Sequence, residues 1–129
     1  MRVRQSNADV TASDYYWCYE GFYRNLTTGD GEIGGGGNGT ALQFHHGDGY
    51  SDNTSFNANA TIDIFNPLST AYRLFRADTV WFEGSNTNYM KITSDMFCYR
   101  GNTTALSGVS FFMSSGSIQQ GIFKLYGMK

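Results

Sequence analysis

Short runs of alternating side chains, separated by turns rich in glycine and asparagine, limit what this chain can fold into. The clearest run is DYYWCYEGFYRN, Asp14 to Asn25, in which Tyr15, Trp17 and Tyr19 alternate with Tyr16, Cys18 and Glu20. A period of two with many aromatic residues is typical of a β-strand. The chain has sixteen Gly and only one Pro, and it lacks the long Ala, Leu, Glu and Lys runs that favour helices. The sequence therefore predicts an all-β fold.

Further strand-like runs follow along the chain. They are GTALQFHH, ATIDIFN, TAYRLFRADTVWFEG, NYMKITSDMFCYR, LSGVSFFMSSG and QGIFKLYG. The stretch from Gly29 to Gly39 holds seven glycines, and we expect it to be a loop. About eight strands at this spacing predict an antiparallel β-sandwich, with a jelly roll favoured over another Greek-key topology. We expect the last run to close a hairpin, with its aromatic side chains in the core.

The length of the chain, 129 residues, corresponds to one domain. Residues 14–129 are predicted to form a single β-sandwich domain. Residues 1–13 are polar and have no clear period, so we expect an extended N-terminal arm.

Charge and cysteine content narrow the class of protein. The net charge of −2 argues against a nucleic-acid partner, which would require clustered Lys and Arg. No apolar run approaches the ~18 residues of a membrane span, and MRVRQSNADV lacks the core of a signal peptide. We therefore expect no membrane partner and synthesis in a cytoplasm. Cys18 and Cys98 do not form a disulfide framework, and we expect both thiols to be free.

The sequence offers little for catalysis or cofactor binding. GEIGGGGNGT has no Lys and no helix-like run after it, so it does not match a phosphate-binding loop. His45, His46, Asp48 and Asp52 are metal-ligand types, but adjacent histidines on a strand point to opposite faces. We predict no metal, no cofactor and no enzymatic activity. The weak alternative is an enzyme that depends on His45, His46 or Glu32.

The aromatic cluster between Asp14 and Asn25 leaves three interpretations open. Its rings are core, an interface between subunits, or a platform on which sugars stack.

The end of the chain, ALSGVSFFMSSGSIQQGIFKLYGMK, resembles the C-terminal signature of structural proteins of tailed bacteriophages. The shared elements are a strand with small, apolar and glycine residues in a fixed pattern at Leu106–Val109, a Ser/Gly turn at Ser114–Gly116, the I-x-x-G step Ile118–Gly121 and the final LYG at Leu125–Gly127. The glycine-rich loop and the short stretch after the first strand depart from the pattern. The resemblance implies a jelly-roll or related sandwich that trimerises as a head decoration (cement) protein or a tail-associated domain, without catalytic residues.

The resulting hypothesis is a non-enzymatic virion protein, a homotrimer that binds the major capsid protein on the outer head surface and stabilises the shell. The predicted partner contacts are Met1, Arg2, Val3, Arg4, Tyr15, Trp17 and Tyr19. The alternative is a tail-fibre or tail-tip domain that binds a host surface glycan through its aromatic residues and the loops at Gly29–Asn38 and His45–Asn53. Deleting Met1–Ala12 is expected to abolish only the first function.

Overall fold

The computed structural model describes residues 1–24, 28–44, 58–82, 90–101, 104–113, 118 and 120–127. Over these residues the chain forms eight strands and no helix, so the predicted all-β fold is confirmed. The strands are β1 (Arg2–Gln5), β2 (Ala8–Asp9), β3 (Tyr15–Arg24), β4 (Gly29–Gly39), β5 (Asn59–Phe65), β6 (Arg73–Phe82), β7 (Met90–Tyr99) and β8 (Gly108–Ser110).

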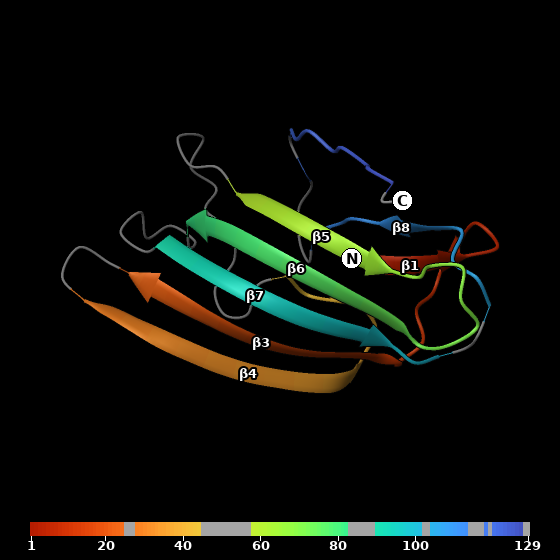
Figure 1. The fold of residues 1–129 in the computed structure, drawn as a ribbon, viewed down its shortest axis with the longest axis horizontal. Coiled ribbons are helices and arrows are strands. Elements are labelled where there is room, and N and C mark those ends of the chain that lie inside the picture. The colour runs from red at the N-terminus through yellow and green to blue at the C-terminus, as the bar shows by residue number, and fades with distance from the viewer. Residues whose placement is uncertain are drawn as a thin grey trace.

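The strands form two antiparallel sheets that pack on each other (Figure 1). The larger sheet has the order β4-β3-β7-β6-β5, and the smaller one has the order β2-β1-β8. Buried side chains from both sheets form one core, as expected for a sandwich. The jelly-roll topology is not confirmed by this strand order.

The three longest predicted runs form the centre of the larger sheet. Each of β3, β6 and β7 is ten residues long, and their aromatic and β-branched side chains fit a pleated ladder. In β6, burial alternates residue by residue from Arg73 to Trp81, as in one uninterrupted strand. The run ATIDIFN falls on β5, which forms one edge of the sheet.

The glycine-rich stretch is a strand rather than the predicted loop. Its residues Gly29–Gly39 form β4 and pair along the whole length of β3, with an irregularity between Tyr15 and Trp17. Ring atoms of β3 occupy the space above the β4 glycines. A Cβ on Gly36 would lie 2.7 Å from the Trp17 ring, and one on Gly34 would lie 2.6 Å from the Tyr19 ring. The glycines are therefore needed for ring packing, which composition alone did not reveal.

The first thirteen residues belong to the fold instead of forming a free arm. Residues Arg2–Gln5 pair with β8 on one side and with β2 on the other. Ser6 and Asn7 connect β1 to β2, with φ of 49° and 64°, as a two-residue hairpin turn of type I′ requires.

The C-terminal run QGIFKLYG is not part of a sheet. None of residues 120–127 lies in a strand, and all of them are exposed. The predicted hairpin is therefore wrong for this part of the chain, and so is the prediction that its aromatic side chains are core. The predicted strand GTALQFHH is also not found: residues 40–44, the part of this run that is described beyond β4, lie in no strand, although Leu42 is buried.

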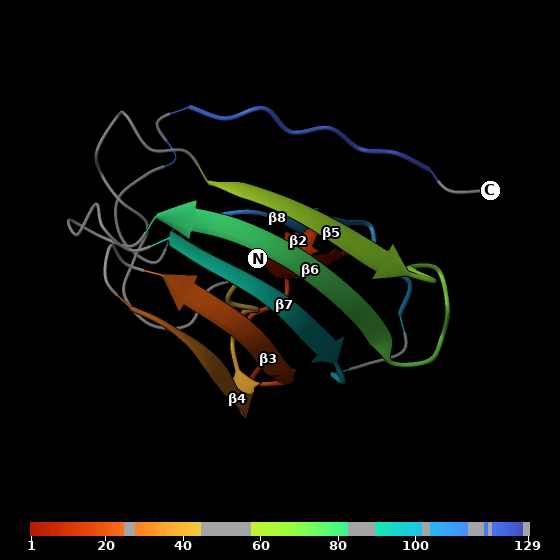
Figure 2. The same cartoon turned by 60° about the vertical axis from the view of Figure 1, so that its left-hand side comes forward.

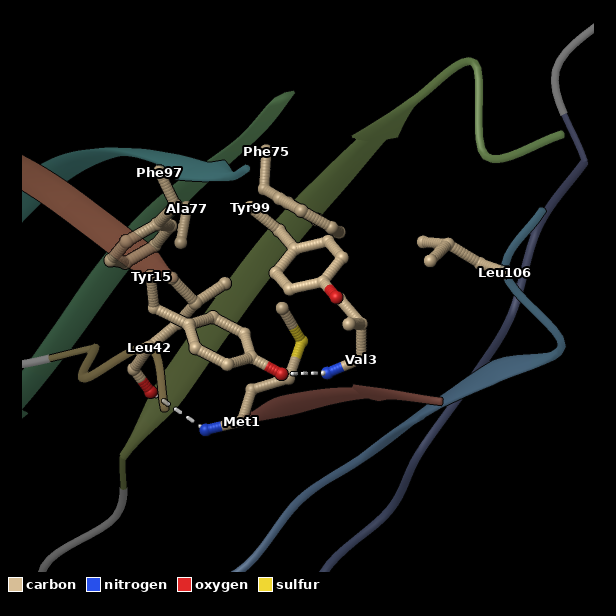
Figure 3. Packing of buried hydrophobic residues seen from close by; sticks show 9 residues of the cluster. All are labelled: Met1, Val3, Tyr15, Leu42, Phe75, Ala77, Phe97, Tyr99 and Leu106. Carbon is tan, nitrogen blue, oxygen red and sulfur yellow. Dashed lines mark hydrogen bonds between the residues drawn. The ribbon is translucent and has the colours of Figure 1, made fainter. Parts of the chain in front are cut away.

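The core lies between β1 and the larger sheet (Figure 3). It contains Met1, Val3, Tyr15, Leu42, Phe75, Ala77, Phe97, Tyr99 and Leu106. The rings of Tyr15 and Tyr99 are tilted against each other with centroids 5.1 Å apart. Because Val3 on β1 and Met1 just before it lie in this core, the small sheet depends on the first residues of the chain.

Candidate interaction surfaces

The apolar residues of the predicted N-terminal arm face inward. Val3 is fully buried and Met1 nearly so. The Met1 amino group donates a 2.7 Å hydrogen bond to the Leu42 carbonyl, and the Leu42 N–H donates one of 2.9 Å to the Met1 carbonyl. Burial, and secondarily the charge of Arg2, lowers the pKa of this amino group to about 5. Met1 and Val3 are therefore not available to a partner, and deleting Met1–Ala12 would remove part of the core.

The two arginines of β1 are engaged within the chain. The Arg2 Nε donates a 3.0 Å hydrogen bond to the Thr40 carbonyl, and its guanidinium lies 4.6 Å from the centre of the Phe112 ring. The Arg4 Nε lies 3.2 Å from a carboxylate oxygen of Asp9. Both ion-pair partners are about two-fifths exposed, so this pair adds little stability.

Tyr15 joins the two sheets through its hydroxyl. Val10 N–H donates directly to the Val3 carbonyl at 3.0 Å. The Val3 N–H instead donates to the Tyr15 hydroxyl at 3.1 Å, and that hydroxyl donates to the Val10 carbonyl at 2.8 Å. The hydroxyl is thus inserted into the pairing between Val3 and Val10. Burial is the main cause that raises the pKa of Tyr15 to about 12. Tyr15 is a structural residue in this chain.

Trp17 and Tyr19 lie on the same face of β3 as Tyr15, and both are half-buried. Their rings cover the glycines of the neighbouring edge strand β4. Of the three interpretations of the aromatic cluster, core packing describes Tyr15, whereas Trp17 and Tyr19 retain some exposed ring surface.

Next to these rings, the inner face of the larger sheet is polar. Thr93 donates to Asp95 at 2.8 Å, and Thr79 and Thr93 lie 2.7 Å apart through their hydroxyl oxygens. A hydroxyl has one proton, and Thr93 uses its proton in the bond to Asp95. Thr79 therefore donates to Thr93, and the chain of hydrogen bonds ends on the Asp95 carboxylate. Lys91 Nζ lies 3.8 Å from Glu32 Oε2. These contacts link polar side chains of neighbouring strands within the larger sheet.

No metal centre is found among the residues that the structure describes: no three side chains of His, Cys, Asp and Glu lie close enough to hold an ion. His45, His46, Asp48 and Asp52 lie outside the described residues, as does the whole of the loop His45–Asn53.

The outer face of the larger sheet, opposite the core, carries exposed apolar side chains. We call the following residues the outer patch: Phe22 on β3, Met90, Ile92 and Met96 on β7, and Val80 and Leu74 on β6. Phe22 pairs with Ile92, and Ile92 pairs with Val80, so these three side chains lie in one row across neighbouring strands. Row neighbours on one face are about 5 Å apart, so these three side chains form a continuous apolar row. The polar row of Glu20, Ser94 and Asp78 separates it from Met96 and Leu74.

A row of polar side chains, Glu20, Ser94 and Asp78, crosses the same face. Asp78 accepts a 2.8 Å hydrogen bond from the Ser94 hydroxyl and lies 3.2 Å from an Arg76 guanidinium nitrogen. Cys18 and Cys98 lie on this face as well, and both are free thiols. Cys18 is exposed, whereas burial raises the pKa of the Cys98 thiol.

The segment from Ile118 to Gly127 forms a second exposed apolar surface. The exposed fraction is 87% for Ile122, 65% for Phe123, 93% for Leu125 and 76% for Tyr126. Phe123 of this segment stacks on Phe111, with ring centroids 5.5 Å apart. In Figure 2 the coloured part of this segment, the dark blue trace, runs above β5. The sequence marked these residues as unusual, but it gave no sign that they leave the body of the fold.

No protein-family model matches the chain, and neither does any curated protein or solved structure. A search of the described residues finds no helix that could cross a membrane.

Proposed function

We propose that this chain is a non-enzymatic structural protein of a phage virion, a decoration protein that binds the outer surface of the head. Its partners are the major capsid protein and further copies of itself in a homotrimer. The resemblance of the C-terminal pattern supports the phage assignment. The observation that carries the proposal is the exposed outer patch.

The size of the outer face supports a binding role. Strands are about 4.8 Å apart and rise about 3.3 Å per residue, so five strands of about ten residues cover roughly 800 Å². A standard protein interface buries about 800 Å² on each partner. The outer patch occupies part of this face, and clustered exposed apolar side chains often mark a binding surface. We therefore assign the outer patch to the contact with the capsid shell.

The mechanism is burial of this patch against the assembled head. A protein that binds the assembled shell, but not its separate subunits, shifts the equilibrium toward the assembled state by mass action. The ion pair of Arg76 with Asp78 leaves polar groups in the middle of the patch, which restrict the orientation of the bound protein.

Co-sedimentation with purified heads that lack this protein tests the proposal. We expect saturable binding, and we expect Phe22→Glu and Ile92→Glu each to weaken it at least ~tenfold, about 1.4 kcal/mol, because a charge would be buried without a partner. Leu68→Glu is the matched control, since Leu68 is 74% exposed and Phe22 is 71% exposed, but Leu68 lies in the turn between β5 and β6.

Equal losses of affinity for heads in the Phe22→Glu and Leu68→Glu variants would contradict the assignment of the outer patch. Host cells are the parallel target. Binding to cells and not to heads would overturn the decoration proposal and support the glycan-binding tail domain instead.

A further inference from the structure

The exposed C-terminal segment has the pattern of a strand without a partner. In Ile122–Tyr126, the side chains of Ile122, Lys124 and Tyr126 would point to one face of an extended strand, and those of Phe123 and Leu125 to the other. None of the described residues from 118 to 127 belongs to a β-ladder. Exposed apolar side chains on both faces suit a strand that is covered on both faces.

The fold also has an edge strand that lacks a neighbour. Within the described residues, β5 is the last strand of the larger sheet and pairs on one side only, with β6. Ile62 and Ile64 are half-buried and pack against the core, whereas Asp63 and Phe65 point to the outer face. An apolar edge of this length is a template for another strand.

The two elements match in pattern and charge. If Lys124 lies opposite Asp63, then Phe123 and Leu125 fall opposite Ile64 and Ile62 on the inner face. On the outer face, Ile122 then falls opposite Phe65. A shift by one residue would place Phe123 or Leu125 opposite Asp63, so the alternation selects this register.

The partner that fits best is a second copy of the chain. The four large side chains of Ile122, Phe123, Leu125 and Tyr126 stay at least 65% exposed on their own chain, where Phe123 is held on Phe111. In Figure 2 the coloured trace of this segment runs above β5 and belongs to no strand.

We propose that residues 120–127 of one copy add to the β5 edge of a neighbouring copy as a sixth strand. If each copy gives one segment and receives one, and the rotation between copies closes, the contacts form a ring, as in a trimer. The proposal builds on the self-association in the proposed function, but it does not depend on binding to a phage head.

Disulfide trapping tests this pairing without heads. Asp63→Cys and Lys124→Cys are made in separate copies, each with Cys18→Ser and Cys98→Ala, then co-expressed with different tags and oxidised with diamide. Residues directly opposite on paired strands have the Cα separation that a disulfide needs. We expect a cross-linked heterodimer in at least ~tenfold higher yield than for Ala60→Cys with Lys124→Cys. Ala60 is exposed on the same strand but points to the other face.

Two results would overturn the proposal. One is the absence of a specific cross-link between copies that are folded by circular dichroism. The other is a cross-link that forms only within a single chain carrying both cysteines, because that places the segment on its own sheet. As a second measurement, a chain that ends at Ser117 is expected to stay folded and become monomeric by light scattering. An unchanged oligomer would also contradict the exchange.

Discussion

Replacing Tyr15 with Phe removes one oxygen atom and, according to the structure, leaves two buried backbone groups without a partner. The Val3 N–H and the Val10 carbonyl both use this hydroxyl, at 3.1 and 2.8 Å. A buried polar group that loses its partner costs about 1–3 kcal/mol, so we expect Tyr15→Phe to lower the free energy of unfolding by ~3 kcal/mol. For a chain of this length that corresponds to a fall in Tm of about 10 °C.

Tyr16→Phe is the matched control, because Tyr16 is the next residue of the same strand. Its hydroxyl donates a 2.7 Å hydrogen bond to Asn38 at the exposed surface, where water can replace it. We expect a change of less than ~0.5 kcal/mol, as for most surface substitutions. Urea unfolding of both variants, followed by far-ultraviolet circular dichroism, gives the two values. Similar losses in the two variants, or a loss below ~1 kcal/mol for Tyr15→Phe, would refute the inserted-hydroxyl argument.

Two further predictions concern the β4 glycines and the buried amino group. Gly36→Ala should destabilise the fold by ~1–3 kcal/mol and displace the Trp17 ring, because the new Cβ would lie 2.7 Å from that ring. Gly108→Ala is the control and should be nearly neutral, because the nearest atom to its new Cβ lies 4.0 Å away. Tryptophan fluorescence and urea midpoints check both, and equal effects would contradict the packing explanation. Folding lowers the pKa of the Met1 amino group from 8.0 to about 5, so between these pH values the unfolded chain binds more protons than the folded chain. The free energy of unfolding should therefore decline by up to ~4 kcal/mol as the pH falls through that window. The Nα-acetylated chain should lack this component, and identical pH slopes for the two chains would contradict it.

The sequence predicted the centre of the larger sheet well because local pattern decides it. The alternation in Tyr15–Arg24, Arg73–Phe82 and Met90–Tyr99 is strong, and each run is a strand. The same alternation separates the two faces of β7 but does not tell which face is covered. The face with Lys91, Thr93 and Asp95 is buried, and the face with Met90, Ile92 and Met96 is exposed. Polarity alone would favour the reverse, so the outer patch could not be predicted.

The remaining errors come from contacts between distant parts of the chain. The propensity of the β4 glycines indicates a loop. They lie in a strand because the rings of Trp17 and Tyr19 occupy the space that side chains at these positions would fill. The polar residues 1–13 have no period, yet Val3 lies in the core, where β8 and the Tyr15 hydroxyl hold its strand. The run Gly121–Gly127 has strand character but no partner strand within the described fold, so propensity overestimated its order. Three of the residues predicted to contact a partner, Met1, Val3 and Tyr15, lie in the core.

The pairing of β1 with β8 affects how this chain is made. The hydrogen bond from Asn7 N–H to the Ser107 hydroxyl joins residues that are 100 positions apart. While the ribosome builds the chain, Met1 and Val3 have no sheet to complete until β8 emerges, because contacts between distant segments form late. Throughout that time the core side of the larger sheet stays open, in addition to its apolar outer face. Expression at low temperature or with a chaperone should therefore raise the yield of folded protein more than any change in the codons of the first strand.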